Sequence, residues 1–387
     1  MRKIKVLHII TRLISGGAEN NTLLTVKGLR EKGYEVGLAA GPSDQKEGDL
    51  EYAFHQLDIK LFVLPSFVRQ PNLIKDLITA YKLYVLIRKE KYDIVHTHVS
   101  KAGILGRWAA KLAGVPIICH TTHGNIFDSY FNKYLTKMFI LFNKITVKIT
   151  DKMITITNVG KKQWLDYHIG RSCQYVSIYS GIDMNVFTSD AVKKSRSVLR
   201  KSVGLSDNDI IIGNVGRLAP IKGHRYLIEA IPLIVHKVKN AKFLIIGDGP
   251  SREELEALSN NLKVDGYINF IGMNDNIPEL LSIMDIFVLP SLNEGMGRAL
   301  VEAMAMRLPC VASAVGGVVE VIAHEETGLL VLSKDPNALA DSIIRLIENQ
   351  SEAEAIAGRA QKKACSIFSS QTMINDIVKV YEDLIPQ

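Results

Sequence analysis

Short apolar runs alternate with helix-like segments along the whole chain. In the first half such runs include residues 6–10, 94–97 and 116–120, and in the second half residues 210–215 and 286–290. Continuous apolar strands separated by helices are typical of parallel sheets that are buried on both faces. We therefore predict the α/β class, with doubly wound parallel sheets covered by helices.

The length of the chain predicts more than one sheet. A chain of 387 residues is too long for one ordinary domain. The pattern turns polar near residues 185–197, so we predict one Rossmann-like domain over residues 1–187 and a second over 188–369. A C-terminal helix over residues 370–387 is expected to pack back on the first domain. Two such domains facing each other would place a ligand crevice at the carboxyl ends of their strands.

Charge is shared unevenly between the halves. Residues 1–187 hold 26 Lys and Arg against 15 Asp and Glu, a net charge of +11, whereas the whole chain has +7. A basic first half predicts an anionic surface or partner for that domain. No nucleic-acid-binding signature accompanies this charge, so we expect no nucleic-acid partner.

Other compositional features indicate the compartment. No apolar run reaches the roughly 18–20 residues of a membrane-spanning helix. The four cysteines are far apart, and we expect buried thiols in a reducing compartment. These features predict a cytoplasmic protein.

The most informative motif runs from residue 293 to residue 305. A glycine-rich turn follows an apolar strand and opens a helix, with Glu294 before the helix and Glu302 about two turns into it. Free N–H groups at such a turn suit a phosphate or a sugar hydroxyl, and two carboxylates can accept hydrogen bonds from hydroxyls. From spacing alone, a capped helix with one solvated glutamate explains the motif equally well.

This motif resembles the Glu-x7-Glu motif of the retaining glycosyltransferases of family 4, which have the two-Rossmann-domain B fold. Further similarities follow in the family's order along nearly the whole chain. They are Gly16-Gly17-Ala18-Glu19, His96-Thr97-His98, His123-Gly124, Ser180-Gly181-Ile182-Asp183, Gly216-Arg217-Leu218, Lys222-Gly223, Gly247-Asp248-Gly249-Pro250 and Gly316-Gly317-Val318.

The resemblance implies roles for residues of the second domain. Arg217 and Lys222 would bind the donor diphosphate, and two cations there could stabilise it as it leaves. Glu302 would bind the ribose hydroxyls, and Glu294 the hydroxyls of the transferred sugar. Four further residues are expected to contact the donor through main-chain groups or close approach: Gly249, Gly295, Met296 and Gly297. Met273, in the turn after residues 268–271, would hold the base of the nucleotide through main-chain contacts.

In the first domain, Gly16 and Gly17 would let the backbone approach the donor. His123 corresponds to the family's active-site histidine, and we expect it to bond a sugar hydroxyl near the reacting carbon. His96 and His98 stand at a strand end, where a structural and a functional role are both open. The remaining strand histidines, His8 and His120, are expected to be structural.

Retention of anomeric configuration needs either a carboxylate nucleophile or departure and attack on one face. We identify no nucleophile, so the leaving diphosphate, held by Arg217 and Lys222, would accept the acceptor's proton. No cofactor and no divalent metal is expected, because the two cations replace it. Asp207-Asn208-Asp209 spells Asp-x-Asp, but it precedes a strand far from the motifs and is interpreted as a polar turn.

A lysine-rich segment spans residues 131–152. Its lysines are spaced as one stripe of a helix, with aromatic and apolar residues nearby: Lys133, Lys137, Lys144, Lys148 and Lys152. Such a helix can rest on an anionic bilayer, although a core-packed helix with a solvated lysine face explains it too. We predict peripheral contact with the inner face of the cell membrane and a lipid-linked glycan acceptor.

The predicted function is transfer of a hexose or N-acetylhexosamine from a nucleotide-sugar, with UDP favoured over GDP, in capsule, exopolysaccharide or lipopolysaccharide synthesis. Two alternatives stay open: a nonhydrolysing UDP-sugar epimerase, and a non-catalytic sugar-nucleotide-binding protein. The chain departs from the family's commonest pattern at Gly297-Arg298, where many relatives have Pro and an apolar residue. Arg298 could contact an acidic sugar or a phosphate, or face solvent.

Overall fold

The structure is a computed structural model that describes residues 2–14, 16–43, 50–57, 59–124, 133–188, 192 and 194–385. The chain divides into two compact units. The first unit is Met1–Gly181 with Ser370–Gln387, and the second is Ile182–Ser369. The sequence pattern placed the change of domain after residue 187, within a polar stretch of which residues 189–191 and 193 lie outside the described part.

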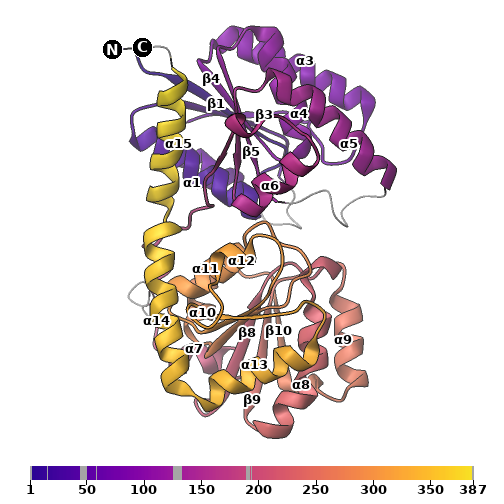
Figure 1. Cartoon of the computed structure of the whole chain (residues 1–387), viewed down its shortest axis with the longest axis vertical. Helices are drawn as coiled ribbons and strands as arrows, with labels where there is room; N and C mark the ends of the chain where they lie inside the picture. The colour runs from indigo at the N-terminus through magenta and orange to yellow at the C-terminus, as the bar shows by residue number, and fades with distance from the viewer. Residues whose placement is uncertain are drawn as a thin grey trace. The chain divides into compact units, whose positions relative to one another are not determined.

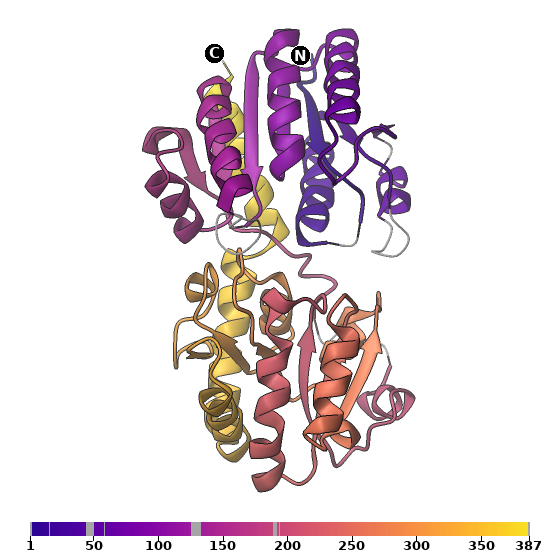
Figure 2. The same ribbon diagram turned by 90° about the vertical axis from the view of Figure 1, so that its right-hand side faces the viewer.

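The first unit contains one parallel sheet with helices on both faces (Figures 1 and 2). Its described strands are β1 (Lys5–Ile10), β2 (Glu35–Ala40), β3 (Lys60–Val63), β4 (Ile94–His98), β5 (Ile117–Thr122), β6 (Lys152–Thr155) and β7 (Tyr175–Ser177). Its described helices are α1 (Gly17–Glu31), α2 (Glu51–His55), α3 (Leu73–Glu90), α4 (Ser100–Ala113), α5 (Lys133–Thr146), α6 (Asn158–Asp166) and α15 (Ser370–Leu384).

The strand order of this sheet is β3-β2-β1-β4-β5-β6-β7. The chain therefore winds outward from β1 in one direction and then returns to β4, which pairs in parallel with β1 on its other side. On one face, residues of α1 and α15 share a core with Ile10, Leu38 and Ile154. On the other face, α3 and α4 cover Leu7, Val95 and Ile118. Both faces are buried, which explains why the strands read as continuous apolar runs.

The second unit repeats this plan. Its described strands are β8 (Ile210–Val215), β9 (Ala241–Ile246), β10 (Ile268–Gly272), β11 (Ile286–Leu289), β12 (Cys310–Ser313) and β13 (Leu329–Val331). Its described helices are α7 (Arg196–Ser202), α8 (His224–Lys237), α9 (Arg252–Asn261), α10 (Ile277–Ser282), α11 (Arg298–Ala305), α12 (Val318–Val321), α13 (Pro336–Glu348) and α14 (Gln350–Ile367). The strand order is β10-β9-β8-β11-β12-β13, all parallel. The predicted fold class, two parallel Rossmann-like sheets, is confirmed.

Two sequence expectations need correction. The lysine-rich segment is not one helix through residue 152, because α5 ends at Thr146 and Lys152 belongs to β6, where its Nζ donates to the carbonyl of Cys173 at 3.1 Å. Residues 131–132 and the side chain of Lys133 lie outside the described part.

The cysteines are free, but only Cys119 and Cys310 are buried. Cys173 and Cys365 are exposed, because positions on a turn and on an outer helix face leave a thiol in water.

Candidate functional site

The carboxyl ends of β8 and β11 mark the point where the strand order of the second sheet reverses. In open parallel sheets, ligands bind at such a switch point, outside the carboxyl ends of the strands. The loops after the two strands contact each other there, since Leu292 N donates to Ile221 O at 2.8 Å. Gly223 makes this approach possible: its φ is +65°, and a Cβ would collide with the carbonyl of Pro290. The second predicted cation, at position 222, thus lies beside the Glu-x7-Glu motif.

Lys222 and Glu294 form an ion pair at this point, with 2.6 Å between Nζ and Oε1. The same carboxylate oxygen accepts a hydrogen bond from Ser291 Oγ at 2.8 Å. The side chain of Glu294 is 10% exposed, whereas that of Lys222 is 30% exposed. Gly316, with a φ of +49°, packs so closely on the backbone of Glu294 that a Cβ would collide with its carbonyl. The carboxylate is therefore fixed, and the ammonium stays accessible.

Glu302 lies on α11 with only 9% of its side chain exposed. Arg298, one turn earlier, pairs with it at 2.8 Å between Nε and Oε1. Burial raises the pKa of Glu302, and the Arg298 guanidinium opposes that rise. The residue that departs from the family's commonest pattern thus compensates the charge of a buried carboxylate.

The other predicted donor residues are spread over the loops at this edge of the sheet. Arg217 is exposed and follows β8. Gly249 follows β9 and packs on the backbone of Leu218, the residue directly after Arg217. Met273 is 51% exposed in the turn after β10. The turn before α11 holds Gly295, buried Met296 and Gly297, whose φ is +84° at the N-cap.

One pocket of this unit is lined by residues of the same loops: Ala219, Pro220, His224, Arg225, Tyr226, Ser251, Glu254, Leu255 and Leu292. The predicted charged residues are not among them.

The Asp-x-Asp turn precedes β8, at the opposite end of that strand. Both of its carboxylates accept hydrogen bonds from nearby protein groups, Asp207 from Ser197 Oγ of α7 and Asp209 from the backbone N–H of Ser206, each at 2.7 Å.

In the first unit the strand order reverses between β1 and β4. Gly16 is the N-cap of α1 after β1, and Gly17 is its first residue. Apart from its chain neighbours and the backbone of its own helix, no atom of the described residues lies within 4 Å of the place where a Cβ of Gly17 would stand, so this turn leaves room for close approach. His98 ends β4, and His123 follows β5 directly. The predicted residues of this unit therefore gather at the carboxyl edge of its sheet.

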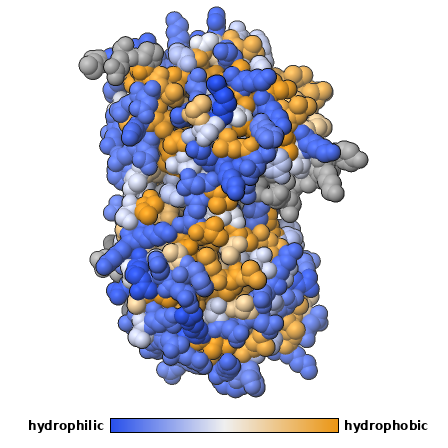
Figure 3. Space-filling view, viewed as in Figure 1, coloured by the Kyte–Doolittle hydropathy of each residue, from blue (hydrophilic) through white to orange (hydrophobic). Residues whose placement is uncertain are grey.

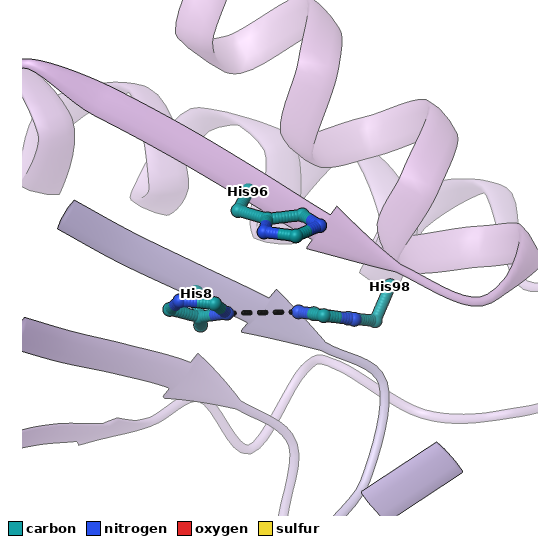
Figure 4. Close-up of side chains that lie close together, drawn as sticks. All are labelled: His8, His96 and His98. Carbon is teal, nitrogen blue, oxygen red and sulfur yellow. Dashed lines mark hydrogen bonds between the residues drawn. The ribbon is translucent and has the colours of Figure 1, made fainter. Parts of the chain in front are cut away.

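His98 bonds two other histidines. Its Nδ1 lies 3.0 Å from Nε2 of His123, and its Nε2 lies 2.8 Å from Nδ1 of His8 (Figure 4). His96 stacks on His98 with 4.5 Å between ring centroids and bonds Tyr381 of α15 at 2.5 Å. Sequence reasoning treated these histidines singly, although the period-2 spacing of residues 96 and 98 places both on one face of β4.

Burial holds these rings neutral. It lowers the pKa of His8 and of the half-buried His123 to about 3, and it lowers the pKa of His96 and His98 well below the ordinary value. The side chain of His120 bonds Thr97 at 2.9 Å, and its pKa is lowered in the same way. Neutral imidazoles can share hydrogen bonds and bind a ligand hydroxyl without adding charge.

The outer surface of the first unit carries an apolar stripe, of which the sequence analysis identified the part on α5 and missed the part on α3. Six side chains of α3 are between 42% and 77% exposed: Leu73, Ile74, Leu77, Ile78, Tyr81 and Val85. On α5 the exposed apolar residues are Leu135, Met138, Leu141, Phe142 and Ile145. Both helices contact α4, and orange atoms gather toward the upper right of Figure 3, where Figure 1 draws α3 and α5. Apolar spacing alone does not distinguish an exposed stripe from a buried one, so the exposure of these residues could not be predicted from their pattern.

Exposed lysines accompany this stripe, including Lys75 and Lys82 on α3 and Lys137 on α5. Phe139, in contrast, packs inward against Trp164, with 6.5 Å between ring centroids. Within the described residues, no helix is both long and apolar enough to cross a membrane.

Comparison with known proteins identifies the family. Residues 15–186 match the model described as Glycosyltransferase Family 4, and residues 195–363 match the model of Glycosyl transferases group 1. The chain is 30% identical over 386 residues to the UDP-Gal:alpha-D-GlcNAc-diphosphoundecaprenol alpha-1,3-galactosyltransferase of Escherichia coli, covering 99% of this chain and 98% of that protein. It is 27% identical to the capsular polysaccharide biosynthesis glycosyltransferase CapM of Staphylococcus aureus, covering 100% and 99%.

Solved structures show the same fold. The Anabaena protein HepE, solved in complex with UDP and glucose, superposes with a TM-score of 0.85 at 23% identity, covering 98% of this chain and all of that one. A glycosyltransferase from Rickettsia africae gives a TM-score of 0.81 at 25% identity, covering 99% of each. With full-length similarity in sequence and fold, the chain belongs to the group 1 glycosyltransferases and acts in glycan synthesis.

Proposed function

We propose that this chain is a retaining glycosyltransferase that moves a hexose or N-acetylhexosamine from a UDP-sugar to a hydroxyl of a lipid-linked glycan. The observation that carries the proposal is the contact between Lys222 and Glu294 at the switch point of the second sheet. It places an accessible cation beside a fixed carboxylate, which are the two groups that a diphosphate and a sugar hydroxyl require.

Lys222 can bind phosphate while it stays paired. An ammonium has three N–H donors, and the bond to Glu294 uses one of them. Arg217, exposed after β8, adds a second cation with a forked set of donors. Together they would stabilise the negative charge that develops on the leaving diphosphate.

Glu302 can bind the ribose in a similar way. Arg298 occupies Oε1, which leaves the second carboxylate oxygen to accept bonds from ribose hydroxyls. Because the carboxylate is almost fully buried, an unpartnered state would be costly without Arg298. We propose that Arg298 keeps Glu302 ionised for this purpose and does not contact the transferred sugar.

In the proposed reaction, the bond from the anomeric carbon to the diphosphate breaks as the acceptor oxygen attacks on the same face. The departing diphosphate oxygen takes the acceptor's proton, so no protein nucleophile is required. Lys222 and Arg217 supply the positive charge, and we propose that no divalent metal is needed. His123 of the first unit would donate a hydrogen bond to a sugar hydroxyl.

Similar proteins support the choice of donor and acceptor. The name of the Escherichia coli relative gives UDP-Gal as donor and a diphosphoundecaprenol-linked acceptor, and HepE was solved with UDP. A lipid-linked acceptor also agrees with the exposed apolar residues and lysines on α3 and α5, which together suit an anionic bilayer. We propose that this surface holds the protein on the inner face of the cell membrane.

The proposal is tested by measuring nucleotide release from a panel of UDP- and GDP-sugars, with a polyprenyl-diphosphate-linked sugar as acceptor and with EDTA present. We expect acceptor-dependent release of UDP, and an α-linked product from an α-linked donor by NMR. Lys222→Ala should lose this activity, whereas Lys239→Ala, an exposed lysine between α8 and β9, should keep it. Release without any acceptor product, an inverted product, or loss of activity in EDTA would each contradict a stated part of the proposal.

A further inference from the structure

Three histidine rings form one hydrogen-bonded row in the first unit. It runs from His8 in the middle of β1, through His98 at the end of β4, to His123 after β5. The two links measure 2.8 Å and 3.0 Å between ring nitrogens. Figure 4 shows the first link, with the ring of His96 beside both partners. The centroid of His96 is 5.0 Å from that of His8 and 4.5 Å from that of His98, so the row is packed in place.

The row can hold its protons in only two orders. A neutral imidazole has one N–H and one bare nitrogen, and each link needs one proton between its two nitrogens. The state of His8 therefore decides the states of His98 and His123. Burial lowers the pKa of all three, which keeps each ring neutral at physiological pH.

The outer nitrogen of His8 selects between the two orders. Its Nε2 is buried and has no hydrogen-bond partner among the described residues. A buried N–H without an acceptor is rarer and costlier than a bare lone pair, so the proton of His8 belongs on Nδ1. His8 then donates to Nε2 of His98, and His98 donates from Nδ1 to Nε2 of His123. The proton of His123 is left on its Nδ1.

We propose that His8 and His98 are positioning residues that fix the tautomer of His123, so that His123 presents Nδ1–H as a donor. For catalysis this rests on the proposed function, in which His123 contacts a sugar hydroxyl. The row makes His123 a fixed donor to an oxygen atom rather than a proton acceptor. A wrong tautomer would offer a lone pair where a hydroxyl oxygen needs an N–H.

A metal ion is the competing explanation of the cluster. One nitrogen each of His8, His96 and His98 lie within 4.8 Å of one another, and all three side chains are buried. Two nitrogens on one tetrahedral zinc ion lie roughly 3.3 Å apart, whereas His8 and His98 are linked directly at 2.8 Å. Both nitrogens of His96 already bond oxygen atoms, those of Tyr381 and Thr121. Shared protons explain these distances better than a shared ion.

The direct test is nitrogen NMR of the purified wild-type protein with labelled histidine. We expect His123 and His98 to be neutral and protonated at Nδ1. A proton on Nε2 of His123, or zinc bound to the purified protein with the matching shifts, would overturn the proposal. This measurement needs no turnover, so it stands even if the protein transfers no sugar.

The kinetic test compares two variants of His98 that differ in hydrogen bonding. His98→Leu fills similar space without polar atoms and should lower kcat by about 10- to 100-fold, with KM for the UDP-sugar changed less than about threefold. His98→Gln keeps a donor and an acceptor and should recover most of that loss. Unchanged kcat in a folded His98→Leu protein, checked by thermal melting, would overturn the proposal. If that variant does not fold, the wild-type tautomer still decides the matter.

Discussion

The switch points of the two sheets share a topology but differ in chemistry. In the first unit the strand order reverses between β1 and β4, and the side chains there are neutral histidines. In the second unit it reverses between β8 and β11, where two ion pairs stand in the loops and on the following helix: Lys222–Glu294 and Arg298–Glu302. One fold thus supplies an uncharged site and a charged site at corresponding places.

The difference teaches how the environment of each site sets its task. Helices cover both faces of the first sheet, so strand side chains such as His8 and His98 are buried. A charge on a buried side chain would be costly. Loop side chains such as Lys222 keep contact with water and can stay charged until an anion arrives. We therefore expect a nucleotide diphosphate to bind the second unit, and uncharged hydroxyl groups to bind the first.

The largest expected effect falls on turnover. Lys222→Ala should lower kcat/KM by about 10²- to 10³-fold, because it removes a charge that stabilises the leaving diphosphate. Steady-state release of UDP measures this, with Lys239→Ala as the matched control. Equal activity in the two variants would show that the charged switch point is not the donor site.

Binding of the nucleotide alone should show the next effect. Glu302→Ala should weaken UDP binding by about 1.5–3 kcal/mol, the usual value of a hydrogen bond to a charged group, which is about 10- to 150-fold in Kd. Isothermal titration calorimetry measures it. Glu354→Ala, an exposed glutamate on α14, serves as control. If Glu302→Ala binds UDP as tightly as the wild type, Glu302 does not bind the ribose, and its carboxylate serves only the structural ion pair with Arg298.

Lowering the pH should destabilise the first unit more than the second. The first unit holds four fully buried neutral histidines, His8, His96, His98 and His120, whose pKa values lie below the ordinary value of 6.5. The unfolded chain takes up these protons below about pH 6.5 while the folded unit does not. The free energy of unfolding is therefore not reduced by these histidines above pH 6.5. As the pH drops from 6.5 toward 3, it falls by about 1.4 kcal/mol per pH unit for each histidine.

Hydrogen exchange at pH 7 and pH 5, corrected for intrinsic rates, measures this loss for each unit. In the second unit, burial lowers the pKa of His224 to about 4. The strands of the first unit should lose more protection than those of the second. A larger loss in the second unit would contradict the assignment of neutral rings to the first.

The smallest effect concerns the outer surface of the first unit. Lys137→Ala on α5 should weaken binding to anionic vesicles by about 1 kcal/mol, about fivefold, because each basic residue near the surface contributes that much. Co-sedimentation at low salt measures it, with Lys239→Ala of the second unit as control. Failure of the wild type to bind such vesicles would remove the membrane proposal and leave the transferase proposal standing.

Much of the fold could be predicted because local pattern and burial agree. The apolar run at residues 210–215 coincides with β8, and the helix predicted after the glycine-rich turn of the 293–305 motif coincides with α11. At both places the pattern of apolar residues agrees with what the fold buries. Short strands such as β3 and β7 were not predicted, because three or four residues carry little periodicity. The helix through residue 152 was wrong because lysine spacing continues past the end of α5 into β6.

Candidate site residues were named from motifs, whereas their partners depend on contacts distant in sequence. The pair Lys222–Glu294 spans 72 positions, and the link His8–His98 spans 90. Neither spacing has a pattern that a single sequence reveals. Arg298–Glu302 is different, since an i,i+4 pair on a helix could have been predicted from spacing alone.

The central claim is that the charged switch point of the second unit binds the donor diphosphate. A crystal structure of the protein with UDP tests it most directly. We predict phosphate oxygens within hydrogen-bond distance of Arg217 and Lys222, and ribose hydroxyls on Glu302. UDP bound elsewhere, with Lys222 and Glu302 contacting only protein atoms, would contradict it.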